Sequence, residues 1–166
     1  DIQDRDELLQ WIKTITRRKD VWQGERSMVD MCELVQKHYY SPRMKGSNSI
    51  KAVLPAVLNE SIFLKEKYGK PVYGSINGIK SLNYTDWTWV QYDGTDVKDP
   101  YKILPPIFSP EDDQKLDNLL DSDSIHDGGA AMTAYARMQF TEMSDRERGD
   151  IARSLLRYCE LDTLAM

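Results

Sequence analysis

Apolar residues recur every three or four positions near the start of the chain, which is the spacing of one face of an α-helix. Leu8, Leu9, Ile12 and Ile15 form such a stripe. Charged and polar residues occupy the positions between them, as on the solvent side of a surface helix. The pattern therefore predicts an amphipathic helix over residues 4–16.

A second helical pattern follows a polar loop. Ser27 is suited to be the N-cap of this helix, since a serine side chain can accept from the free backbone N–H groups of the first turn. Val29, Cys32 and Val35 then fall on one face. The helix is predicted to continue to about Tyr39.

A third helix is predicted after a loop that contains glycine and serine. Either Ser47 or Ser49 can cap it. Pro55 lies too late for the first turn, so the helix is expected to stop or kink near Leu54. One more helix is expected to end before Gly69, a residue type common just after helices.

The pattern changes over residues 70–108, where aromatic and turn-forming residues replace the helical spacing. Residues 87–92, of sequence WTWVQY, alternate as in a strand, and Asp93-Gly94 follows directly. An Asp-Gly pair after such a run is a strong signal for a tight turn between two strands. We therefore predict an inserted β-hairpin at about 87–99.

Helical signals return in the last third of the chain. Residues 100–106 begin and end with proline and are expected to be extended. Residues 109–111, Ser-Pro-Glu, combine a cap, a first-turn proline and an acid, and so predict a helix start. Asp127 is expected to cap a helix that runs to about residue 140. Ser144 and Glu147 have the spacing of a capping box for the last helix.

These elements predict an α+β fold, rich in helix and with one inserted hairpin. The 166 residues correspond to a single domain over 1–166. The sequence starts with Asp1 rather than methionine, and Met166 lies in an apolar helical run without a cap. We therefore expect a segment of a longer polypeptide, cut at both ends.

Composition narrows the class of protein. The mean hydropathy is −0.60, and no apolar run approaches the roughly 20 residues needed to cross a bilayer, so no membrane partner is expected. The two cysteines, Cys32 and Cys159, are far apart and form no Cys-x-x-Cys pair. Both are expected to be buried free thiols, which indicates a reducing, cytoplasmic location.

Charge is unevenly distributed along the chain. The net charge is −5, but residues 1–80 hold 14 basic against 10 acidic side chains, and the excess acid lies in the second half. An overall acidic chain argues against a general coat for nucleic acid. A locally basic face fits contact with phosphates along one groove, and it fits ordinary solvated helix faces as well.

The most informative pair is Tyr158 and Asp162, which lie four residues apart. On a helix this spacing places both side chains on one face. A carboxylate can bind a divalent metal ion, and a phenol one turn away can orient a water beside it. Many helices carry the same pair without any catalytic role. The surrounding sequence is therefore needed to judge whether this pair is catalytic.

Several stretches in a fixed order carry a family resemblance. They are MVDMCELV at 28–35, YYSP at 39–42, MKGSNSIKAVLP at 44–55, DGGAAMTAY at 127–135 and YCELDTLAM at 158–166. In this order they resemble the bacterial family called domain of unknown function 2779, which is similar to the C-terminal part of a DnaQ-like nuclease with a ribonuclease-H fold. The resemblance covers most of residues 27–166, and the region near 70–108 matches it less well.

The resemblance implies a two-metal 3′–5′ exonuclease of the DEDD type, with Mg²⁺ or Mn²⁺ as the cofactor. Asp162 would be its last metal carboxylate, and Tyr158 would position the attacking water. Asp30 is a further candidate metal ligand, although an acid at a helix start can also be a simple cap. The first DEDD motif, Asp-x-Glu on a strand, does not occur at a matching place in this sequence. The segment alone is therefore expected to be inactive and to bind no metal tightly.

The resemblance also implies nucleic acid as the substrate and the upstream part of the same polypeptide as a partner. Lys45, Ser47 and Lys51 surround a helix start, where free N–H groups and positive charge suit a phosphate. Plain helix capping explains the same residues. The alternative function is a non-catalytic module that binds a protein or nucleic acid, and an upstream Asp-x-Glu strand would distinguish the two.

Overall fold

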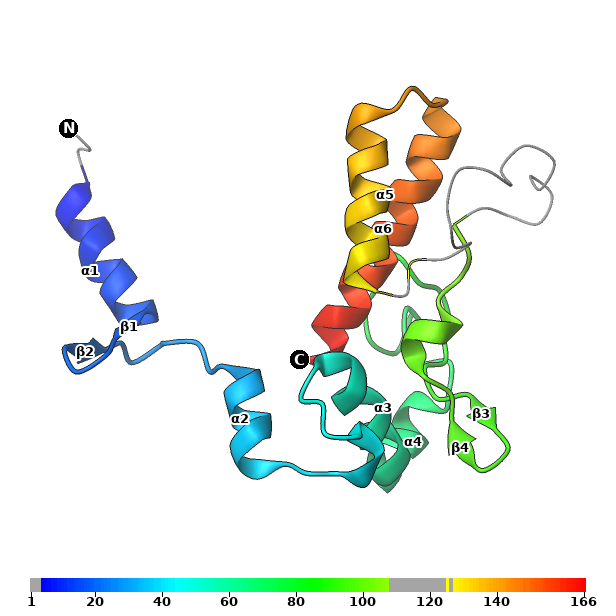
Figure 1. The fold of residues 1–166 in the computed structure, drawn as a ribbon, viewed down its shortest axis with the longest axis horizontal. Helices are drawn as coiled ribbons and strands as arrows, with labels where there is room; N and C mark the ends of the chain where they lie inside the picture. The colour runs from blue at the N-terminus through cyan, green and yellow to red at the C-terminus, as the bar shows by residue number, and fades with distance from the viewer. Residues whose placement is uncertain (1–3, 108–124, 126) are drawn as a thin grey trace. The chain divides into compact units, whose positions relative to one another are not determined.

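The computed structural model describes residues 4–107, 125 and 127–166. Its backbone forms two compact units, Asp1–Tyr40 and Ser41–Met166, and each is described by itself. Of the described residues, 54% are helical, and within them the strands form two small two-stranded sheets. The mixed helix and strand content of the predicted α+β class is thus confirmed (Figure 1). Among the described residues, no helix has the length and apolar character required to cross a bilayer.

The first unit contains two helices joined through a short β-ribbon. Helix α1 covers Arg5–Ile15, close to the predicted range. Strands β1 (Arg17–Arg18) and β2 (Trp22–Gln23) pair antiparallel, and helix α2 covers Met31–His38. No described residue of this unit is buried, so its helices keep their apolar side chains accessible to solvent.

Helix α2 begins later than predicted. Asp30, rather than Ser27, is its N-cap, and the Asp30 Oδ1 atom accepts from the backbone N–H groups of Cys32 and Glu33 at 2.9 and 3.2 Å. Both serine and aspartate cap helices well, so the sequence offered two starts. The expectation that Cys32 is buried is wrong, because its side chain is exposed and free, as is that of Cys159.

The second unit opens with three short helical elements: η1 (Pro42–Met44), α3 (Ile50–Glu60) and α4 (Ile62–Tyr68). Ser49 is the N-cap of α3, one of the two predicted choices. The predicted stop near Leu54 is wrong, because α3 continues through Pro55. Burial of Ala56 and Leu58 on the following turn holds the helix together despite the missing backbone donor.

Strands β3 (Tyr92–Asp93) and β4 (Asp96–Val97) confirm the predicted hairpin, with Tyr92 opposite Val97. Gly94 supplies the positive φ of +62° that the turn needs. The strands are shorter than expected, because Trp87 pairs with Tyr73 instead. The predicted extended run over 100–106 is partly wrong. Its first residues form the 3₁₀ helix η2 (Pro100–Ile103).

Two antiparallel helices complete the unit (Figure 1). Helix α5 (Gly128–Phe140) is capped by Asp127, and α6 (Asp145–Ala165) begins with the predicted capping box of Ser144 and Glu147. Asp127 accepts from the backbone N–H of Ala130 at 2.9 Å. The helix start predicted at residues 109–111 lies outside the described residues.

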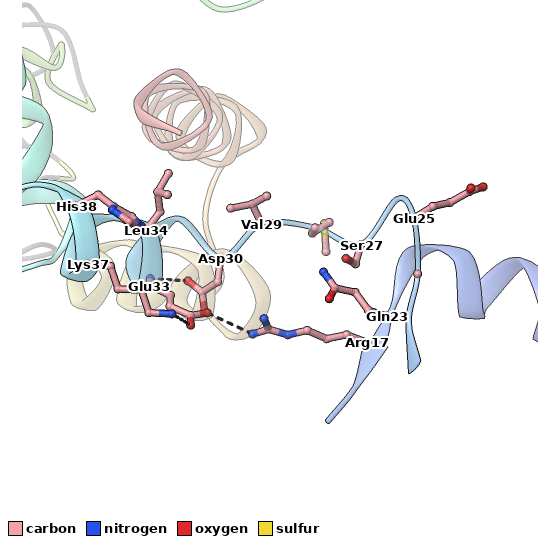
Figure 2. A pocket seen from close by; sticks show the side chains of 12 residues that line it. Arg17, Gln23, Glu25, Ser27, Val29, Asp30, Glu33, Leu34, Lys37 and His38 are labelled. Carbon is pink, nitrogen blue, oxygen red and sulfur yellow. Dashed lines mark hydrogen bonds and ion pairs between the residues drawn. The ribbon is translucent and has the colours of Figure 1, made fainter. Parts of the chain in front are cut away.

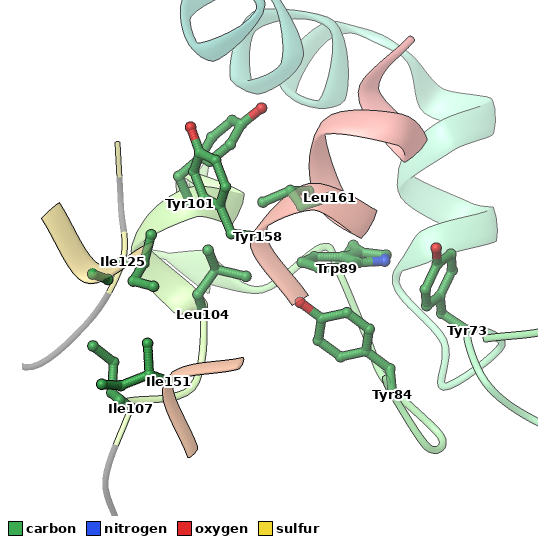
Figure 3. Close-up of a cluster of buried hydrophobic side chains, with 11 residues drawn as sticks. Tyr73, Tyr84, Trp89, Tyr101, Leu104, Ile107, Ile125, Ile151, Tyr158 and Leu161 are labelled. Carbon is green, nitrogen blue, oxygen red and sulfur yellow. The ribbon is translucent and has the colours of Figure 1, made fainter. Parts of the chain in front are cut away.

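The core of the second unit is rich in aromatic rings (Figure 3). Trp89 is 1% exposed and lies edge-on against Tyr73 and Tyr84, with ring centroids 5.6 and 5.0 Å apart. Leu161 of α6 is fully buried in the same cluster. The region 70–107 therefore packs beneath α6 and fixes the position of its last turns.

Candidate functional site

Asp162 lies in the last turn of α6 and is partly exposed. Its Oδ1 atom accepts a hydrogen bond from the Tyr101 hydroxyl at 2.6 Å. This is a short, charge-assisted type of bond, since a phenol donates to a carboxylate. The carboxylate is thus fixed at one oxygen by a residue that is 61 positions away in the sequence.

Tyr101 is held rigidly by the start of η2. The Asp99 side chain accepts from the backbone N–H of Tyr101 at 3.0 Å, and Pro100 is the first residue of the 3₁₀ helix. The Tyr101 side chain is only 2% exposed. Burial and the adjacent Asp162 carboxylate raise the pKa of Tyr101 above the ordinary tyrosine range, so it remains a neutral donor at physiological pH.

Tyr158 lies one turn before Asp162 and is buried, with its ring against that of Tyr101 (Figure 3). The two ring centroids are 6.0 Å apart at an interplanar angle of 56°. The ring therefore contributes to the core as well as to the candidate site. Its proposed role in orienting a water stays a prediction.

Lys51 is the third predicted residue that the structure brings to this place. Its Nζ atom lies 4.9 Å from the ring centroid of Tyr158 and 5.2 Å from that of Tyr101. A cation over an aromatic face is attracted by the ring quadrupole. The Lys51 ammonium of α3 thus lies against two tyrosine rings, and the hydroxyl of one of them, Tyr101, donates to Asp162.

Lys45 and Ser47 occupy the exposed loop before α3. Lys45 ends η1 in a left-handed conformation with φ of 50°. The Ser47 hydroxyl accepts from the backbone N–H of Ser49 at 3.2 Å. Ser47 thus shapes the entry to the helix that carries Lys51, and a contact of either residue with substrate stays a prediction.

Asp30 belongs to the first unit, where it borders an open polar pocket of about 580 Å³ (Figure 2). Beside it, Glu33 accepts from Lys37 at 2.5 Å and from Arg17 at 3.4 Å. Lys37 first, and then Arg17, lower the pKa of the Glu33 carboxyl. Asp30 acts as a helix cap in this structure, whereas Asp162 lies within the other unit.

Polar contacts that the sequence did not reveal hold α6 in place. Glu160 is half-buried and accepts from Asn83 Nδ2 at 2.5 Å. The Tyr84 hydroxyl donates to the Arg157 carbonyl at 3.1 Å, and Arg157 donates to the Asn83 carbonyl at 3.2 Å. The helix that carries Tyr158 and Asp162 is therefore clamped by the 70–89 region.

Tyr101 is the residue of this site that sequence reasoning missed. The Asp99-Pro100 pair is a local signal for a capped helical turn, and it could have placed Tyr101 at a helix start. Nothing local indicates that its hydroxyl meets Asp162, because that contact depends on the tertiary fold.

Comparisons with family models, curated proteins and solved structures give no match for this chain.

Proposed function

We propose that this chain is the C-terminal part of a metal-dependent, DnaQ-like 3′–5′ exonuclease with a ribonuclease-H-like fold, in which Asp162 supplies the last metal carboxylate. The observation that carries the proposal is the cluster formed by Lys51, Tyr158 and Asp162. These three residues belong to two distant sequence motifs, and all three contact or lie against Tyr101.

Mg²⁺ and Mn²⁺ prefer oxygen ligands, and a partly exposed carboxylate fits that preference. A carboxylate has about four lone-pair positions, so the bond from Tyr101 leaves several for an ion. Within the described residues, no three His, Cys, Asp or Glu side chains gather to hold a metal. The remaining ligands would therefore come from the upstream part of the polypeptide, where an Asp-x-Glu strand is expected. When bound, the metal ions would activate water and stabilise charge on the phosphodiester.

In this arrangement Tyr158 would place its hydroxyl near the water, one helical turn from the metal ligand. Lys51 would add positive charge beside the scissile phosphate, and Lys45 and Ser47 would contact the nucleic-acid backbone further along the strand. The cytoplasmic location is part of the same proposal, and it accords with two free thiols.

The test is an assay of the complete polypeptide on 3′-labelled oligonucleotides, DNA and RNA in parallel, with Mg²⁺ or Mn²⁺. Asp162→Asn should lower the rate of nucleotide release on the order of 10²-fold or more, because the loss of a negatively charged ligand weakens the hold on the metal ion that stabilises the transition state. Asp145→Asn is the matched control, since it removes an exposed carboxylate from the first turn of the same helix. Equal rates for the wild type and Asp162→Asn would refute the nuclease assignment.

A non-catalytic binding module is the second candidate, and the first unit favours it. That unit leaves several large apolar side chains exposed, among them Trp11 at 54%, Met28 at 88% and Val29 at 69%. Large exposed apolar side chains in number can mark a binding surface. An upstream sequence without Asp-x-Glu, together with no nucleotide release by the complete polypeptide, would select this alternative.

A further inference from the structure

The contact between Tyr101 and Asp162 has the features of a positioning interaction. The donor is nearly fully buried, and the acceptor is partly exposed at the end of a helix. The 2.6 Å bond joins η2 to α6 across the edge of the core. A buried hydroxyl needs some acceptor, but a backbone carbonyl would meet that need equally well, as it does for Tyr84.

A carboxylate at a helix end rotates easily, because the χ2 torsion of aspartate is broad. A metal ligand with free rotation loses that freedom on binding, which weakens the affinity. A donor that fixes one carboxylate oxygen removes this cost in advance. Outer donors of this kind orient metal ligands in many proteins.

We propose that Tyr101 is a positioning residue that holds one oxygen of Asp162, so that the other oxygen faces a divalent cation. This inference rests on the proposed function, since it requires a cation at Asp162. Tyr101 itself touches neither the metal nor the substrate, and it acts only through the carboxylate.

The surroundings of Tyr101 suit this role, because they keep the ring from moving. Pro100 and Tyr101 are both buried, and the Asp99 cap fixes the backbone of the turn. The Tyr158 ring packs on one side, and the Lys51 ammonium lies over the ring. The hydroxyl can therefore serve as a fixed point for a more mobile carboxylate.

The experiment is a Mn²⁺ titration of the complete isotope-labelled polypeptide, which includes the upstream ligands that the proposed function requires. It is followed by paramagnetic broadening of backbone amide signals in the last two turns of α6. Tyr101→Phe removes only the hydroxyl and keeps the ring. It should weaken Mn²⁺ binding about tenfold, the lower end of the usual effect of losing an outer-shell donor. Broadening that is unchanged in Tyr101→Phe would overturn the inference.

Tyr84→Phe is the matched control, because Tyr84 is also buried and also donates to α6. Its acceptor is the backbone carbonyl of Arg157, so its loss should destabilise the fold by a similar amount without affecting Mn²⁺. A purely structural role for Tyr101 predicts equal changes in the two variants. Equal changes would therefore also overturn the inference, and amide spectra of both variants check that each is folded.

Asp162→Asn distinguishes a failure of the positioning role of Tyr101 from a failure of the metal site at Asp162. If Asp162→Asn abolishes the broadening and Tyr101→Phe does not reduce it, only the positioning role fails, while the metal ligand stands. If the broadening in Asp162→Asn equals that of the wild type, no cation binds at Asp162, and both proposals fail. Reduction in both variants, with Tyr84→Phe unchanged, is the expected result.

Discussion

Helices α1 and α6 share an amphipathic sequence pattern, yet only one of them is buried. Helix α1 has no buried residue, whereas α6 buries Ile151, Ser154, Tyr158 and Leu161. The pattern determines where a helix forms and which of its faces is apolar. Burial additionally requires a surface that covers that face, and in the second unit the aromatic region 70–107 provides it.

The difference has energetic consequences. An isolated helix shorter than about 12–15 residues is marginal in water, and α1 has 11. Within the second unit, edge-on aromatic pairs such as Tyr84–Trp89 add roughly 0.5–1.5 kcal/mol beyond the area they bury. The second unit should therefore carry most of the cooperative stability of the chain.

The largest expected difference in the free energy of unfolding is between two tryptophan variants, one in each unit. Trp89→Ala should lower the free energy of unfolding by about 3–5 kcal/mol, because it opens a cavity in the core. Trp11→Ala should change it by less than about 0.5 kcal/mol, since Trp11 is 54% exposed. Urea denaturation followed by circular dichroism measures both. A comparable loss for Trp11→Ala would show that α1 is buried after all.

The comparison also shows what sequence could and could not predict. The capping box at Ser144, the Asp127 cap and the hairpin at Gly94 depend on neighbouring residues, and all three are confirmed. Where two caps compete within a few residues, as Ser27 and Asp30 do, local sequence does not decide. The helical path through Pro55 was missed, because burial of the next turn offsets a local defect.

The candidate site likewise combines features that local sequence predicts with contacts that it does not. The spacing of Tyr158 and Asp162 on one helix follows from local geometry, and so sequence was sufficient to pair them. The bond from Tyr101 to Asp162 and the clamp between Asn83 and Glu160 join residues 61 and 77 positions apart. Contacts over such separations depend on the packing of the whole unit, which local periodicity does not encode.

The next effect is a loss of stability at alkaline pH, confined to the second unit. Burial is the main reason that the pKa values of Tyr73, Tyr84 and Tyr101 are raised. The unfolded chain loses its tyrosine protons near pH 10, while the folded chain keeps these three. Their stabilisation is thus complete below about pH 10 and declines above it, by at most about 1.4 kcal/mol per pH unit for each tyrosine.

Melting temperatures between pH 8 and 12 measure this loss for the wild type and Tyr101→Phe. The variant lacks one of the raised groups, so its stability should fall less steeply with pH. Parallel curves for the two proteins would mean that Tyr101 titrates normally in the folded chain. Salt should change the slopes little, because burial outweighs charge in raising these pKa values.

The smallest expected effect compares the N-caps of α6 and α2. Ser144→Ala removes a capping box from a packed helix and should lower the free energy of unfolding by about 1 kcal/mol, measured by urea denaturation. Asp30→Ala removes the cap of a helix that buries nothing, so it should speed amide exchange in α2 and leave the urea midpoint unchanged. Asp30→Asn is the control, because asparagine caps as well as aspartate and removes only the charge. A shifted urea midpoint in Asp30→Ala would show that α2 unfolds together with the core. The two units would then differ in how exposed their residues are, but they would unfold in one cooperative transition.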